Sequence, residues 1–90
     1  NEEKAKPFNA QDIRFTTNKG ALYALFLGRA QGSTTIRSLA RGRVDGTIGQ
    51  VTLLGGGPLP FRQDGAGLHV DMPRTGHFVP AIRIDGRGLI

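Results

Sequence analysis

Cysteine and tryptophan are both absent from this chain of 90 residues. Without cysteine, neither a disulfide framework nor a thiolate metal site can form. The absence of cysteine does not indicate whether the protein resides in an oxidising or a reducing compartment. No apolar run approaches the roughly 20 residues that a membrane-spanning helix needs. Runs of strong helix formers are nearly absent as well. These absences exclude a disulfide scaffold and a thiolate metal centre, and they disfavour a helical fold.

An initiator methionine and a signal peptide are also missing, so we expect the chain to be an excised piece of a longer protein. Its length allows one small domain of marginal stability. Residues 1–11 are polar with one proline and one phenylalanine, which indicates an entering linker. Residues 12–90 then form the domain.

Glycine and proline are plentiful, with 14 and 5 of the 90 positions. They interrupt the chain often enough to favour short strands, and the aliphatic and aromatic residues fall in strand-like runs between them. Seven strands, spaced by turns every eight to twelve residues or so, are typical of a two-sheet sandwich. The sequence therefore predicts an all-β fold: a small antiparallel two-sheet β-sandwich with Greek-key-like connections.

The stretch DIRFTTNKGALYALFLG, residues 12–28, predicts a β-hairpin. Ile13 and Phe15 alternate with polar residues, the period-2 pattern of a strand with one wet and one buried face. Asn18-Lys19-Gly20 can reverse the chain, because asparagine tolerates a left-handed backbone and glycine takes positive φ without steric cost. Gly20 is expected at positive φ.

The second half of this hairpin, Leu22 to Leu27, is apolar at every position and bounded by two glycines. A run of that length suits a central strand covered on both faces better than a helix. We expect one face to carry Tyr23, Leu25 and Leu27, and the other to carry Leu22, Ala24 and Phe26.

Five further strands are expected, at residues 34–39, 47–54, 59–63, 68–72 and 78–84. Gly49 is expected to form a bulge in the second of these. Residues 64–67 join the third to the fourth as a second hairpin, with Phe61 in the core. Pro80 is expected at an edge or bulge, and the tail from Gly86 is expected to fray, with Leu89 and Ile90 able to dock.

A glycine run, Gly55-Gly56-Gly57-Pro58, closes the strand at residues 47–54. Such a run can cradle a phosphate where it links a strand to a helix N-terminus. Neither a helix pattern nor a Lys-Ser/Thr pair follows it here. We therefore expect a simple turn.

The opening of the chain carries a family resemblance. Residues 1–27, NEEKAKPFNAQDIRFTTNKGALYALFL, resemble the start of the C-terminal domain of family 29 α-L-fucosidases, with its K-PF-A-DIRFT-K-LYA pattern. The likeness continues through residues 51–55 (VTLLG) and 67–70, and so covers most of the chain. In that family a (β/α)8 barrel carries the chemistry and a small antiparallel β-sandwich follows it.

The resemblance implies a non-catalytic C-terminal accessory domain that packs against the upstream catalytic barrel of its parent. The parent would be a retaining glycoside hydrolase acting on α-L-fucosyl groups of glycans, and would be periplasmic, secreted or lysosomal. Its nucleophile and acid/base belong to the barrel, so no catalytic residue carries over to this chain. The isolated domain is expected to self-associate through the surface that the barrel would cover.

The acidic residues of the chain do not form a catalytic pair. A retaining glycosidase needs two carboxyl groups about 5 to 5.5 Å apart. Three aspartates precede glycine in expected turns, where a short acceptor satisfies backbone N–H groups: Asp45, Asp64 and Asp85. Two glutamates, Glu2 and Glu3, lie in the linker, which leaves Asp12 and Asp71 on the wet faces of strands.

His69 and Asp71 are candidate metal ligands, because they lie two apart on one expected strand and so share a face. Two ligands are too few for a metal site, and His77, in an expected turn, is only a distant third candidate ligand. A surface hydrogen bond between the imidazole and the Asp71 carboxylate is the better interpretation. We expect no metal and no cofactor.

The formal charge of +5 raises the question of nucleic-acid binding. The cations are spread singly along the chain, however, at Arg14, Arg37, Arg62, Arg74 and Arg83, and Arg41-Gly42-Arg43 is the one pair. Phosphate binding needs clustered cations, preferably among exposed aromatics. Solvated strand faces are the better interpretation, so we expect neither nucleic acid nor a membrane as partner.

An independent carbohydrate-binding module is the alternative function. Exposed rings can stack on a pyranose, and the aromatic residues considered for this are Phe15, Tyr23, Phe26, Phe61 and Phe78. Each falls on an apolar strand position, which favours core packing. Tyr23 is the exception, since its hydroxyl needs a partner or water and favours the rim. A module should expose aromatic residues on one sheet face, and a docking domain an aliphatic patch.

Overall fold

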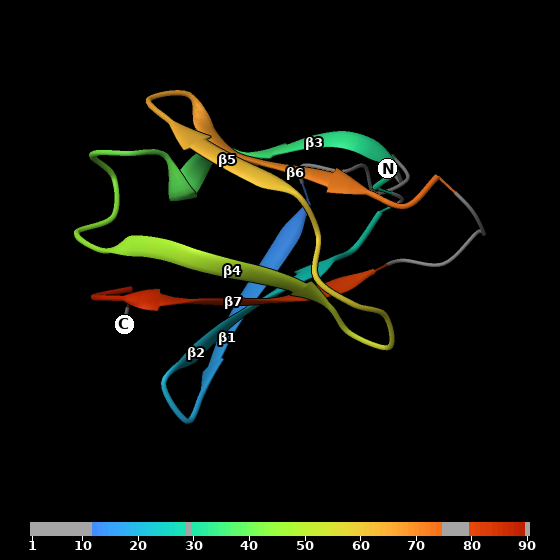
Figure 1. Cartoon of the computed structure of the whole chain (residues 1–90), viewed down its shortest axis with the longest axis horizontal. Helices are drawn as coiled ribbons and strands as arrows, with labels where there is room; N and C mark the ends of the chain where they lie inside the picture. Colours follow the sequence, from blue (N-terminus) through green and yellow to red (C-terminus); the bar gives the residue numbers. More distant parts are fainter. Residues whose placement is uncertain (1–11, 29, 75–79, 90) are drawn as a thin grey trace, which may run out of the picture.

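The computed structural model describes residues 12–28, 30–74 and 80–89. Within these ranges the chain forms seven strands and one short 3-10 helix, arranged as two layers (Figure 1). The elements in chain order are β1 (Ile13–Asn18), β2 (Ala21–Phe26), β3 (Gly32–Ile36), η1 (Arg37–Leu39), β4 (Thr47–Leu53), β5 (Phe61–Asp64), β6 (Gly67–Met72) and β7 (Ala81–Arg87).

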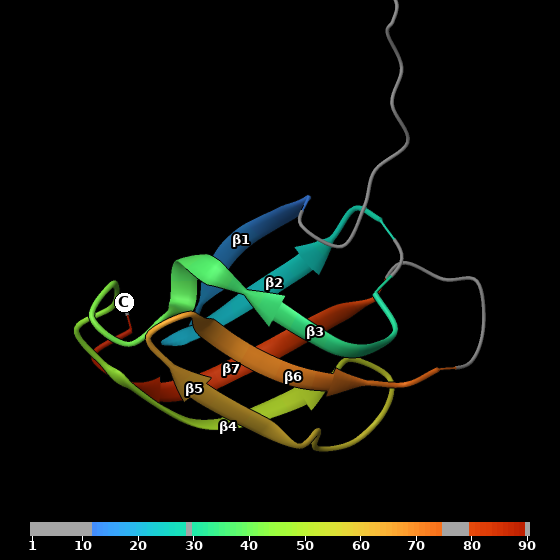
Figure 2. The same ribbon diagram turned by 90° about the horizontal axis from the view of Figure 1, so that it is seen from above.

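The strands form two antiparallel sheets, a four-stranded one in the order β1-β2-β7-β4 and a three-stranded one in the order β3-β6-β5. In the view from above, the three-stranded sheet lies over the four-stranded sheet, and the strands of the two sheets cross (Figure 2). The prediction of an all-β, two-sheet antiparallel fold is confirmed. No helix in the ranges that the structure describes is long and apolar enough to cross a membrane.

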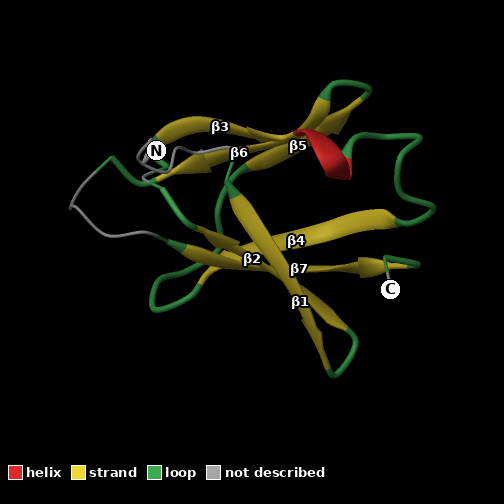
Figure 3. Cartoon of the chain, turned by 180° about the vertical axis from the view of Figure 1, so that it is seen from behind, coloured by secondary structure: helices red, strands yellow, loops and turns green. Residues whose placement is uncertain are grey.

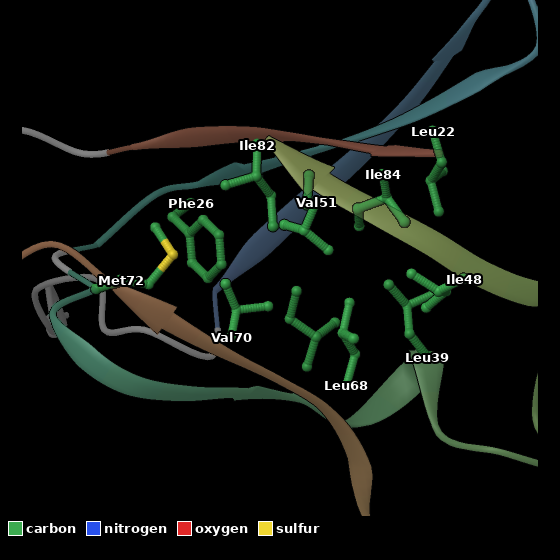
Figure 4. Close-up of a cluster of buried hydrophobic side chains, with 13 residues drawn as sticks. Leu22, Phe26, Leu39, Ile48, Val51, Leu68, Val70, Met72, Ile82 and Ile84 are labelled. Carbon is green, nitrogen blue, oxygen red and sulfur yellow. The ribbon is translucent and has the colours of Figure 1, made fainter. Parts of the chain in front are cut away.

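The core lies between the two sheets, where their inward side chains meet (Figure 4). Both sheets contribute because alternate residues of each strand point inward. Burying a side chain of this kind stabilises the fold by about 1.5–3 kcal/mol. The largest side chains that are fully buried are Phe26, Ile36, Val51, Leu68, Val70, Met72, Ile82 and Ile84.

The hairpin of β1 and β2 confirms the first prediction. Asn18 pairs with Ala21, so the reversal is confined to Lys19 and Gly20 rather than shared by three residues. Both have positive φ, 52° and 83°. Two positive values match the twist of the flanking strands, which makes this the favoured kind of two-residue hairpin loop.

The prediction that β2 is covered on both faces is wrong. Leu22, Ala24 and Phe26 are buried, but Leu25 on the other face is 38% exposed. The alternation itself is correct. In a two-layer antiparallel fold a central strand has a covered inner face and an open outer one, so an unbroken apolar run is no guarantee of burial on both sides.

Strand β3 begins two residues earlier and ends three residues earlier than predicted, because η1 follows it directly. Ile36 and Leu39 are both buried, at 1% and 5% exposure. Their spacing of three residues fits the 3-10 turn, which brings positions i and i+3 to the same side, and does not fit a strand. The short helix thus adds Leu39 to the core.

Strand β4 contains the predicted bulge, since its register with β7 shifts between Ile48 and Gln50, on either side of Gly49. The glycine run after β4 is a turn, as predicted. Gly55 has φ of 83°, and the Gly56 N–H donates to the Leu53 carbonyl at 2.9 Å. This turn leads toward β5 and not into a helix.

The C-terminal strand departs from prediction at its far end. β7 runs to Arg87 between β2 and β4, so the tail does not fray from Gly86. Gly46 and Gly86 permit this, because a Cβ on either would collide with the backbone of the facing strand end. Leu89 packs partly buried against the core. Ile90 lies outside the described residues.

Pro80 lies just before β7 and belongs neither to an edge strand nor to a bulge. Its carbonyl accepts a hydrogen bond from the Phe26 N–H at 3.0 Å, and proline retains the ability to accept such a bond. The linker at residues 1–11 and the start of the predicted last strand, residues 78 and 79, lie outside the described ranges.

Replacement of Gly20 by valine should destabilise the hairpin. A β-branched residue at φ of 83° is forced into a costly backbone region, so we expect a loss of about 1–3 kcal/mol and a clearly lower unfolding midpoint. Gly57→Val is the matched control, because a Cβ there meets nothing within 4 Å and φ is not positive. Equal midpoints for the two variants in thermal denaturation would contradict the assignment of strain to Gly20.

Candidate functional site

The outer face of the three-stranded sheet is polar. We call this surface the polar face; it consists of Ser33, Thr35, Arg62, Asp64, His69 and Asp71. The register explains the grouping, since Ser33 pairs with Asp71, and Thr35 and Arg62 both pair with His69. Side chains of paired residues share one face of a sheet. A hollow of about 290 Å³ lies here, open to solvent and lined by Pro60, His69 and Asp71 among others.

His69 links all three strands of this sheet. Its Nε2 lies 2.8 Å from Asp64 Oδ1, and its Nδ1 lies 2.9 Å from Thr35 Oγ1. In the neutral ring, an Nε2–H donates to the carboxylate while Nδ1 accepts from the threonine hydroxyl; in the charged ring, both nitrogens donate. Both protonation states therefore keep both hydrogen bonds.

Asp64 is the most heavily bonded acid of the described chain. Its Oδ1 accepts from the N–H groups of Ala66 at 2.8 Å and Gly67 at 3.2 Å, and its Oδ2 accepts from Arg62 at 2.6 Å. The hydrogen bond from His69, together with that from Ala66, holds the pKa of Asp64 well below its usual range. The predicted role of Asp64 as acceptor in its own turn is confirmed.

The predicted hydrogen bond between His69 and Asp71 is wrong: the carboxylate that His69 meets is that of Asp64. Residues two apart on a strand point the same way but stand roughly 7 Å apart. The β5–β6 turn instead brings Asp64 alongside the ring. Asp71 is exposed on the same face. His77, the third ligand considered, lies outside the described residues.

The other acids are dispersed over different elements. Asp85 lies in β7 and not in a turn as predicted, and accepts from Arg83 Nε at 2.9 Å. That carboxylate raises the pKa of Arg83, with a smaller contribution from Tyr23. Asp12 precedes β1 and Asp45 lies in the loop before β4. Among the described residues, no three of the metal-ligating types come together. Glu2 and Glu3 lie outside those residues.

The outer face of the four-stranded sheet is apolar at its centre. We call this surface the apolar face; it consists of Tyr23, Leu25, Leu54 and Ala81. Tyr23 and Leu25 come from β2, and Leu25 pairs with Ala81 at the start of β7. The Leu54 N–H donates to the Ala81 carbonyl at 2.9 Å, which brings Leu54 alongside. A hollow of about 320 Å³ lies over these residues, with Thr16 and Asn18 at its border.

The leucines of the apolar face are large and exposed, 38% for Leu25 and 49% for Leu54. The sequence placed Tyr23 and Leu25 together on one face, which is confirmed. It did not place Leu54 or Ala81 with them, because that grouping depends on β7 lying between β2 and β4. Nothing in the local pattern signals such a pairing.

The aromatic residues that the structure describes do not form a platform on either outer face. Phe26 is buried, and Phe61 is partly buried against the core opposite Val70. Phe15 is 39% exposed, contrary to the core packing predicted. It pairs with Ala24 on the inward side of the edge strand β1, whose hairpin points away from the three-stranded sheet (Figure 3). Tyr23 is half-buried on a central strand and not at the rim. Phe78 lies outside the described ranges.

Comparison with known proteins identifies no family. No protein-family model matches the chain, and no curated protein matches it at a significant level. The resemblance to the fucosidase C-terminal domain therefore depends on the residues that carry it.

Acid should weaken the contribution of Asp64 to stability. Its pKa is lowered in the folded protein, so its contribution is complete above the ordinary carboxyl value of 3.8 and is lost as the pH falls toward the lowered value. Asp64→Asn retains an oxygen for the Ala66 and Gly67 N–H groups but loses the charge. We expect a lower melting temperature than that of the wild type at pH 7, and a smaller further loss between pH 5 and pH 2.

Asp71→Asn is the matched control. Asp71 is an exposed aspartate on the same face, but His69 donates to Asp64 and not to Asp71. Its melting curve should follow the wild type at every pH. Parallel acid profiles for the wild type and Asp64→Asn would show that the carboxylate makes no such contribution.

Proposed function

We propose that this chain is the non-catalytic C-terminal accessory domain of an α-L-fucosidase, a retaining glycoside hydrolase, and that it packs against the upstream catalytic barrel through the apolar face. The single observation that carries the proposal is the exposure of Leu25 and Leu54 beside Tyr23 and Ala81 on one sheet face. Contiguous exposed apolar groups with a polar border are typical of a surface that another part of a protein covers.

The segment that carries the family resemblance also builds this face. The residues DIRFTTNKGALYAL form β1 and most of β2, and Tyr23 and Leu25 belong to that segment. Because Leu25 is 38% and Leu54 49% exposed, covering them would stabilise the association by up to about 0.6–1.5 kcal/mol for each side chain. Thr16, Asn18 and Arg83 around them supply the polar border of such an interface.

The alternative of an independent carbohydrate-binding module has less support. Sugar stacking needs an exposed ring, and Tyr23 is the one aromatic residue that the described chain places on an outer sheet face. It lies among aliphatic side chains and opposite Arg83. Phe61 borders the hollow of the polar face, but it pairs with Val70 on the inward side.

The docking surface has a direct test in solution. The isolated chain should self-associate through the apolar face, since no barrel covers it, and Leu25→Ser with Leu54→Ser should shift the protein to a monomer in light scattering across a concentration series. Phe15→Ser, at an exposed ring outside this face, should leave the self-association unchanged. A wild-type chain that is monomeric at all concentrations would contradict the docking role.

The catalytic part of the proposal is tested separately. The purified chain should not hydrolyse an aryl α-L-fucoside above background, because the part of it that the structure describes supplies no pair of catalytic carboxylates and no enclosed pocket. The gene should encode an upstream (β/α)8 barrel that does so. Turnover by the 90-residue chain, after removal of contaminating enzyme, would overturn the assignment. A gene that encodes no such barrel would contradict the assignment to a fucosidase, and the apolar face would then have no assigned partner.

A further inference from the structure

Four arginines lie at one end of the sandwich, the end formed by η1, the loop before β4, the β5–β6 turn and the end of β7. Figures 1 and 2 show these segments together at the same end in two perpendicular views. We call this surface the arginine end. Its members are Arg37 in η1, Arg41 and Arg43 in the loop, and Arg87 at the end of β7.

Hydrogen bonds and strand pairing hold these segments in place. The Arg41 N–H donates to the Asp64 carbonyl at 2.8 Å, and the Arg41 guanidinium donates to the Gln63 carbonyl at 3.3 Å, which ties the loop to the end of β5. Thr47 pairs with Arg87, and Gly46 lies against the Arg87 backbone. The fold thus gathers cations that are scattered in the sequence between residues 37 and 87.

The positive charge at this end is not neutralised. All four arginines are exposed, and none of them forms an ion pair with a carboxylate of the described chain. The acids close by are Asp64, which already binds Arg62 and His69, Asp85 in β7, which already binds Arg83, and Asp45 in the loop itself. Four guanidinium groups against one uncommitted carboxylate leave a local excess of positive charge on a chain of net charge +5.

We propose that the arginine end binds a sulfated glycan chain. A guanidinium presents two parallel N–H donors that match the oxygens of a sulfate, and several such contacts along a polyanion gain affinity by releasing its counterions. This inference does not depend on the docking role. Leu54 follows the far end of the seven-residue strand β4, roughly 20 Å from Thr47, so covering the apolar face leaves the arginine end free.

Other anionic partners fit this surface less well. Single-stranded nucleic acid needs aromatic rings for base stacking, and the described aromatics, Phe15, Tyr23, Phe26 and Phe61, lie on β1, β2 and β5, with none in η1 or the arginine-bearing loop. A protein partner or a lipid surface needs an apolar centre. Among residues 12–28, 30–74 and 80–89, the exposed large hydrophobics are Phe15, Leu25 and Leu54, and none of these three belongs to this end.

Fluorescence anisotropy with a labelled, fully sulfated hexasaccharide tests the proposal on the whole chain, at ionic strengths between about 0.02 and 0.15 M. The triple variant Arg37→Gln, Arg43→Gln, Arg87→Gln, which leaves the Arg41 hydrogen bond to Gln63 in place, should bind at least about tenfold more weakly. The dependence of log affinity on log salt should become less steep by about two. Each charge contributes about 0.7 to this slope for single-stranded nucleic acids, and the variant removes three charges. Its melting temperature should stay unchanged, which confirms that it folds.

The matched control is Arg14→Gln with Arg74→Gln, two exposed arginines outside this end, which should bind as the wild type does. The unsulfated hexasaccharide should not bind. Equal losses in the control and the triple variant would mean that net charge acts without a site, and would overturn the proposal. Tighter binding of a DNA duplex than of the sulfated hexasaccharide at equal salt would assign the surface to nucleic acid instead.

Discussion

The backbone pairing of β7 with two partners is the constraint on which the structure depends. β7 lies between β2 and β4, so it joins the N-terminal hairpin to the middle of the chain. Ile82 and Ile84 on its inner side are fully buried. On its outer side, Ala81 joins Leu25 of β2 and Leu54, which follows β4, into one surface. The core and the apolar face thus depend on the same strand, one on each of its sides.

Local features of the sequence were sufficient to predict the hairpins, the bulge and the fold class. Lys19-Gly20 and Gly49 act through their own backbone freedom, which is visible without any knowledge of neighbours. The 3-10 turn was missed because β-branched Thr34, Thr35 and Ile36 favour a strand, and the single three-residue interval from Ile36 to Leu39 is too short to mark a helix. Gly86 was expected to fray because its pairing partner lies some 40 residues earlier in the chain.

The surfaces were less predictable than the strands. The sequence correctly divided β2 into two faces, but only the second sheet decides which of them is covered. The same holds for His69, whose partner Asp64 comes from the end of the neighbouring strand β5 and not from its own strand. It holds most clearly for the arginines, which look scattered until loops and strand ends meet at one end. Chemistry-bearing groups here are assembled by topology, so spacing along the chain cannot reveal them.

The hydrogen bonds of His69 have a consequence for the motions of the domain. They connect β6 to β3 through Thr35 and to the end of β5 through Asp64, so no edge strand of this sheet can detach without breaking one of them. Neither of these two hydrogen bonds involves a strand of the four-stranded sheet. Slow amide hydrogen exchange would therefore report the three-stranded sheet as one cooperative unit, with its two edge strands opening together and separately from β1.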